Sequence, residues 1–117
     1  MNSNERVYRM PFGSVYSLYV KKVERKGRTR DEVDQIIFWL TGYDKQAMQA
    51  HIDNQTDFET FFNQAPRMNP NSAKITGKIC GIRVEEIEDK LIQKVRYLDK
   101  LIDELANGKA LDKIFRT

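Results

Sequence analysis

Residues 72–105 read SAKITGKICGIRVEEIEDKLIQKVRYLDKLIDEL, and this stretch decides the predicted fold. Gly77, Gly81, Ile82 and Ile87 have the spacing of a small residue, a turn glycine and two apolar residues, which is typical of a helix-turn-helix. The second helix of that motif would open with four carboxylates, Glu85, Glu86, Glu88 and Asp89. Because carboxylates at a reading helix repel phosphates, we interpret the segment as a scaffold that does not bind duplex DNA.

The second half of this stretch predicts one long helix from Val84 to Asn107. Its apolar residues recur at alternating spacings of four and three between Leu91 and Leu105. Ile92 and Leu101 widen the apolar stripe beyond that of a coiled coil. We therefore expect a core-facing helix on which the other helices pack.

Residues 74–83 fit two structures. Ile75, Ile79 and Ile82 recur at helical spacing, but the alternation of residue types around Gly77 and Gly81 also suits a strand. We favour a helix. If the segment is instead a strand, residues 6–10 are its expected partner.

Four shorter helices are predicted before this stretch. The clearest begins at a capping box of Thr29 and Glu32 and ends at Gly42. Gly27 is expected to end the helix before it, and Pro66 to end the last of the four. The capping residues predicted for the other three helices are Ser14, Asp44 and Thr56. After the long helix, Gly108 is a stop signal, and residues 111–115 form a last turn that folds back.

These patterns predict a mostly α fold. We expect a single domain over residues 1–117: a multi-helix bundle with a long C-terminal helix and a helix-turn-helix-like segment. The alternative is an α+β fold with a small two-stranded element formed by residues 6–10 and 74–83. The 117 residues can bury one core without a disulfide or a metal. One aromatic and aliphatic cluster is predicted to fill it: Trp39, Leu40, Phe58, Phe61 and Phe62.

The net charge of +3 is unevenly distributed. Residues 1–30 hold eight Lys or Arg against two acids, whereas residues 31–70 hold two against seven. Arg28 and Arg30 precede a predicted helix N-terminus, where a helix dipole does not favour cations. The candidate anion-binding face consists of Lys21, Lys22, Arg25, Lys26, Arg28 and Arg30. The candidate acidic interaction face consists of Glu85, Glu86, Glu88 and Asp89.

Few residues suggest catalysis, a metal or a cofactor. His51 and Cys80 are the only histidine and cysteine, too few to supply the four N or S ligands of a structural zinc site. We expect His51 to serve packing and Cys80 to be a buried thiol, with a reactive Cys80 as the alternative. Residues 36–40 are the longest apolar run, and the N-terminus lacks a signal-peptide pattern. We expect a cytoplasmic protein with no cofactor, no membrane association and no enzymatic activity.

Four strings resemble a small bacterial family known as domain of unknown function 2200. They are RVEEIED (83–89), RYLDKLIDELA (96–106), WLTGY (39–43) and TDFETFF (56–62), and the likeness covers nearly the whole chain. The resemblance implies no activity, cofactor or site. In that family a proline commonly follows the Glu-Asp pair, where this chain has Lys90. This implies a helix break at Asp89 and brings the continuity of the 84–107 helix into question.

Two kinds of function are compatible with these features. The preferred hypothesis is a non-catalytic interaction module that binds another protein, or a second copy of itself as a homodimer, through its charged faces. The alternative is weak nucleic-acid binding through the basic N-terminal face, residues 21–30. Tyr8, Tyr16 and Tyr19 could stack on bases there, although we prefer a position beside the core for them.

Overall fold

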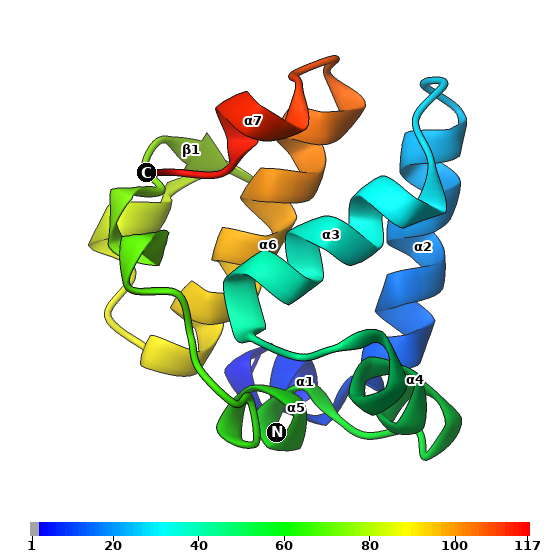
Figure 1. Ribbon diagram of the computed structural model, residues 1–117. Helices are drawn as coiled ribbons and strands as arrows, with labels where there is room; N and C mark the ends of the chain where they lie inside the picture. Colours follow the sequence, from blue (N-terminus) through cyan, green and yellow to red (C-terminus); the bar gives the residue numbers. More distant parts are fainter. Residues whose placement is uncertain (1–2) are drawn as a thin grey trace.

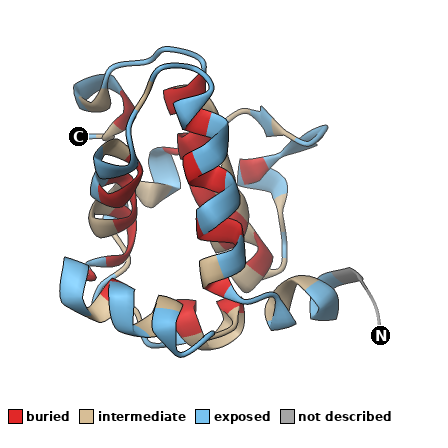
Figure 2. Ribbon diagram, turned by 90° about the vertical axis from the view of Figure 1, so that its right-hand side faces the viewer, coloured by how far each residue is buried: buried red, intermediate tan, exposed pale blue. Residues whose placement is uncertain are grey.

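Three long helices form the frame of the fold in a computed structural model, which describes residues 3–117. They are α2 (Phe12–Glu24), α3 (Arg30–Thr41) and α6 (Lys90–Ala106), and each packs against the other two. Figure 1 shows α3 crossing in front of α6, with α2 beside them. The apolar stripe of each helix faces the others, so the buried residues gather between the helices (Figure 2).

Shorter elements close this frame. At one end lie α1 (Ser3–Arg9), α4 (Lys45–Asp53) and α5 (Phe58–Asn63), while α7 (Leu111–Ile114) folds back against α6 (Figure 1). Between α5 and α6 come two 3-10 turns, η1 (Pro70–Lys74) and η2 (Val84–Glu86), and the strands β1 (Lys78–Ile79) and β2 (Ile82–Arg83). The fold is therefore a mostly α multi-helix bundle with one small antiparallel sheet in the described residues.

The predicted boundaries of α3 and the predicted start of α4 are confirmed. The Thr29 hydroxyl accepts a hydrogen bond from Glu32 N (3.2 Å), and the Glu32 carboxylate accepts one from Thr29 N (3.1 Å). Gly42 ends α3 with a φ of 78°, and a Cβ atom there would lie 3.0 Å from the Arg67 backbone. Asp44 caps α4 by accepting from Ala47 N (2.8 Å).

The predicted start of α2 is wrong by three residues, and that of α5 by one. α2 begins at Phe12, ahead of Ser14, and α5 is capped by Asp57, which accepts from Thr60 N (2.8 Å). The reason is a short antiparallel bridge between Pro11 and Asp57. It fixes the backbone of both segments just before their helices, because Phe12 N donates to Thr56 O and Phe58 N donates to Met10 O.

The helix-turn-helix-like segment is not formed, because residues 78–83 are a hairpin. Its register pairs Lys78 with Arg83 and Ile79 with Ile82, so the turn has two residues. These are Cys80 (φ 53°) and Gly81 (φ 79°), and two positive φ values in a row are typical of a type I′ hairpin turn. The strand alternative for residues 74–83 was thus correct in kind, but residues 6–10 are not the partner, since they belong mostly to α1.

The C-terminal helix is shorter than the predicted 84–107 helix. Val84 begins a 3-10 turn, Ile87 is extended (φ −72°, ψ 122°), and α6 starts only at Lys90. Asp89 is the cap: its carboxylate accepts from Leu91 N and Ile92 N, both at 3.0 Å. The predicted long helix is therefore interrupted before Lys90, at Asp89, which is the position that the family resemblance implied.

The core contains the predicted phenylalanine cluster. The ring of Phe12 stacks on that of Phe61 at 3.8 Å between centroids, and Phe62 lies edge-on to Phe61 at 5.3 Å. Leu40 and Phe58 are also buried in this core. Trp39 is the exception, since its ring stacks on Phe115 of the C-terminal segment instead.

We expect Phe62→Ala to lower the free energy of unfolding by about 3–5 kcal/mol, because it leaves a cavity beside two aromatic rings. Chemical denaturation measures this loss. Leu18→Ala, at a side chain largely exposed to solvent, is the control and should cost less than about 0.5 kcal/mol. A loss of less than about 1 kcal/mol for Phe62→Ala would contradict this description of the core.

Candidate functional site

Two of the six residues of the predicted anion-binding face, Lys22 and Arg28, make ion pairs within the fold. Lys22 pairs with Asp103 of α6 at 3.3 Å. Arg28 is more strongly held: its guanidinium contacts Glu32 (2.6 Å) and also donates to Leu105 O (3.2 Å) and Lys109 O (2.8 Å). Arg28 therefore complements the C-terminal end of α6, which is the favourable position for a cation that the sequence did not reveal.

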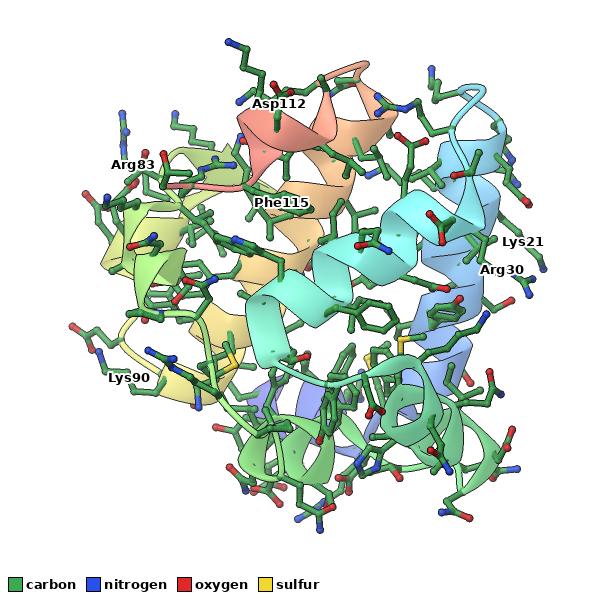
Figure 3. The ribbon with its side chains drawn as sticks, viewed as in Figure 1. Lys21, Arg30, Arg83, Lys90, Asp112 and Phe115 are labelled. Carbon is green, nitrogen blue, oxygen red and sulfur yellow. The ribbon has the colours of Figure 1, made fainter. Side chains whose placement is uncertain are left out.

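The other four basic residues, Lys21, Arg25, Lys26 and Arg30, are exposed and make no ion pair within residues 3–117. Lys21 and Arg30 lie side by side (Figure 3) and line a pocket of about 310 Å³ between α2 and α4. Glu24 lines the same pocket and offsets part of their charge. Arg25 and Lys26 lie at the C-terminal end of α2.

Two tyrosines near the basic run, Tyr16 and Tyr19, form hydrogen bonds to aspartates of other helices. The hydroxyl of Tyr16 donates to the buried Asp34 carboxylate at 2.5 Å, and that of Tyr19 donates to Asp99. Burial, together with the neighbouring carboxylate, raises the pKa of both phenols. The preferred interpretation for Tyr16 and Tyr19, a position at the core, is confirmed.

The predicted acidic face also loses two of its four residues to structural roles. Both oxygens of Glu85 accept from Gly77 N, at 3.0 and 3.2 Å, and so fasten η2 to the base of the hairpin. Asp89 caps α6 and accepts a hydrogen bond from the Tyr8 hydroxyl of α1, which lowers the pKa of this carboxyl. Glu86 and Glu88 are left as exposed carboxylates on this segment.

The residues considered for catalysis lie in separate places. His51 packs against the rings of Tyr43 and Phe61, its Nδ1 is 2.9 Å from the Thr56 hydroxyl, and burial lowers its pKa. The expectation that Cys80 is buried is wrong, because the hairpin turn exposes it. Within residues 3–117, no group of three or more His, Cys, Asp or Glu side chains could hold a metal ion.

An apolar groove between α2 and the hairpin is the feature that the sequence did not predict. It has a volume of about 280 Å³ and is lined by Val15, Leu18, Tyr19, Lys22, Ile79, Cys80 and Asp99; we call it the hairpin groove. Leu18 is 60% exposed and Ile82 is 50% exposed, although both are large apolar residues. Ile82 is the cross-strand partner of Ile79, so the two side chains lie on the same face of the hairpin.

The carboxylate of the hairpin groove is already satisfied. Asp99 accepts from the Tyr19 hydroxyl and forms an ion pair with Arg96 at 2.8 Å. Its charge is therefore neutralised from within the protein. The groove offers an apolar surface with Lys22 at its rim.

The model of the family described as "Uncharacterized protein conserved in bacteria (DUF2200)" matches residues 6–116. The chain therefore belongs to this family. It is similar to a solved structure described as the crystal structure of uncharacterized protein SP1917, with 45% sequence identity and a TM-score of 0.89, covering 97% of this chain and 92% of that one. No curated protein matches the chain. None of the helices within residues 3–117 is long and apolar enough to span a membrane.

We expect Arg28→Gln to lower the free energy of unfolding at neutral pH by about 1.5–3 kcal/mol, because it removes hydrogen bonds from a charged donor. Arg25→Gln, at an exposed cation without an ion pair in the described part of the chain, should change it by less than about 0.5 kcal/mol. Urea denaturation of both variants measures the difference. Equal stabilities for the two variants would show that Arg28 does not tie α3 to α6.

The effect of Arg28→Gln should also depend on pH. The hydrogen bond from Arg28 lowers the pKa of Glu32, so this part of the stability is present above the unfolded-state pKa of Glu32 and is lost as the pH falls through its folded-state value. The stability difference between wild type and Arg28→Gln should therefore shrink below about pH 4. It should not vanish, because the bonds to Leu105 O and Lys109 O do not titrate. If the stability difference between wild type and Arg28→Gln stays constant from neutral pH to below about pH 4, the bond between Arg28 and Glu32 does not contribute to stability as described.

Proposed function

We propose that this protein is a non-catalytic interaction module that binds another protein through the hairpin groove. The observation that supports it most is the exposed apolar side chain of Leu18 in the groove, opposite Ile79 of the hairpin, whose cross-strand partner Ile82 is also exposed. Within residues 3–117, Met10 is the other large apolar residue with comparable exposure, at 40%. A contiguous exposed apolar patch with a polar rim is typical of a protein-binding surface.

The arrangement of the groove supports a role for Leu18 in binding side chains of a partner, and not in closing the core. Tyr19 and Val15 are buried beneath it, so the core is closed without Leu18. The volume of about 280 Å³ lies just below the range of about 300–1,000 Å³ found for small-molecule sites. The groove is thus suited to receive one or two side chains from a partner.

The placement of the reactive side chains supports a non-catalytic role. Cys80 lies in the hairpin turn, while His51 lies on α4 and is held by Thr56 and two aromatic rings. A catalytic cysteine needs a base within hydrogen-bond reach. The contacts of His51 with Tyr43, Phe61 and Thr56 are packing contacts of α4.

A pull-down from a lysate of a bacterium that encodes a family member tests this function. We expect wild type to enrich a protein that remains bound after nuclease treatment, because contact is made through the apolar groove. Leu18→Asp should lose this protein, since it places a charge in the apolar contact. Met10→Asp, with a similarly exposed apolar residue away from the groove, is the matched control and should retain it.

Capture that is equal for wild type and Leu18→Asp would place the contact elsewhere and contradict the proposal. Capture that disappears with nuclease would indicate nucleic acid. Thermal unfolding of both aspartate variants verifies that they fold. Their midpoints should stay near that of wild type, because both side chains are substantially exposed.

We propose weak nucleic-acid binding as the second candidate, because four exposed cations lie along the end of α2 and the start of α3. Lys21, Arg25, Lys26 and Arg30 make no ion pair within residues 3–117, so they are free to bind phosphates. Against it, Tyr16 and Tyr19 are buried and offer no stacking surface. This leaves electrostatic attraction as the source of affinity.

A salt titration of a labelled single strand tests the second candidate. If the four cations each neutralise one phosphate, the slope of log K against log salt should be roughly −3. Changing all four to Gln should abolish binding near about 50 mM salt, whereas a control with Lys45, Lys90 and Lys113 changed to Gln should bind as wild type. No binding by wild type, or equal binding by the four-Gln variant, would remove this candidate.

A further inference from the structure

We infer that the hairpin groove recognises an acidic peptide segment that carries a large apolar residue. This inference rests on the proposed function and adds the chemistry of the partner. Two properties of the described residues lead to it: the groove is apolar at the hairpin, and the helix that forms its other wall becomes basic toward its C-terminal end.

The apolar part of the groove would receive the anchor. Leu18 and Val15 line it on α2, and Ile79 lines it on the hairpin, where the exposed Ile82 is its cross-strand partner. Leu18 is the exposed large apolar residue of this lining, so an inserted side chain would cover apolar surface there. Burial of such surface contributes about 25 cal/mol per Å², which makes an aliphatic or aromatic anchor favourable.

The basic part lies on the same side of α2. Lys22 and Arg25 follow Leu18 by four and seven residues, which is the spacing of one helix face, and Lys26 follows directly. Arg25 and Lys26 are exposed and make no ion pair in the described part of the chain. The pair of Lys22 with Asp103 leaves both side chains partly exposed, at 46% and 33%, so it is weak and easily exchanged.

The acids near the groove offset only part of this charge. Asp99 is paired with Arg96, and Asp103 offsets Lys22. Glu24 lines the pocket on the opposite side of α2. The exposed Arg25 and Lys26 therefore leave this side of α2 with a net positive charge, and carboxylates of a partner beside its apolar anchor would complement it.

A second copy of this chain is a less suitable occupant. Its own acidic segment contains Ile87 between carboxylates, but Glu85 is held by Gly77 N, and Asp89 is held by α6 and Tyr8. Only Glu86 and Glu88 could face a neighbour without breaking these bonds. We therefore assign the groove to a segment of another protein.

A selection from a random peptide library displayed on phage tests the inference. Peptides are selected on wild type and counter-selected on Leu18→Asp, and the enriched sequences are synthesised for affinity measurement by fluorescence anisotropy. We expect sequences with a large apolar residue flanked by Asp or Glu. Their affinity should fall by about tenfold or more in Leu18→Asp and in a variant with Lys22, Arg25 and Lys26 changed to Gln.

Matched controls separate the groove from general effects. Met10→Asp and the variant with Lys45, Lys90 and Lys113 changed to Gln should bind the peptides as wild type does. Leu18→Ala, which adds no charge, should weaken binding by a smaller factor than Leu18→Asp. Binding to wild type should also weaken with added salt, and this dependence should flatten when the three rim cations are removed.

Three outcomes would overturn the inference, and they are distinguishable from failure of the proposed function. Peptides that depend on Leu18 but carry no excess of acidic residues would refute the acidic partner and leave the interaction module standing. If the selection yields no peptide whose binding depends on Leu18, the groove is refuted as a docking site altogether. A dimer seen by sedimentation that is lost in Leu18→Asp would place a second copy in the groove.

Discussion

The carboxylate of Asp89 sets the start of α6, and the arrangement of the hairpin depends on that point. By accepting from Leu91 N and Ile92 N it begins the helix there, and by accepting from Tyr8 it joins that end of α6 to α1. Residues 75–88 are therefore not part of α6. They contain the hairpin, which packs against α6 and borders the groove with α2.

The sequence predicts those elements whose determining contacts are local. The capping box of Thr29 and Glu32, the left-handed Gly42 and the cap at Asp44 each act within a few residues, and all three are confirmed. The hairpin is also local, with a two-residue turn at Cys80 and Gly81. It was missed because Ile75, Ile79 and Ile82 recur at helical spacing, and apolar spacing alone could not distinguish a helix from two short strands.

The candidate site was partly predictable for the same reason. Charge counts identified the basic run, but only tertiary structure shows that Arg28 reaches the carbonyls at the end of α6 while Lys21 and Arg30 face a separate pocket. Tyr8, Tyr16 and Tyr19 each donate to an aspartate of another helix or helix start, at Asp89, Asp34 and Asp99. These pairs satisfy the polar atoms at the helix contacts, and Tyr16 and Tyr19 are buried there, while Tyr8 is half-buried.

The hairpin turn determines which residues face the groove. A two-residue turn with positive φ at Cys80 and Gly81 fixes the pairing of Ile79 with Ile82, and a slip of one residue would point Lys78 or Arg83 toward α2 instead. Such a slip would replace the apolar wall of the groove by a basic one. The turn glycine, far from the core, thereby controls the chemistry of the exposed surface. The position of Ile79 opposite Leu18 in the groove is consequently a product of strand register as much as of helix position, and both must hold for the groove to bind an apolar side chain.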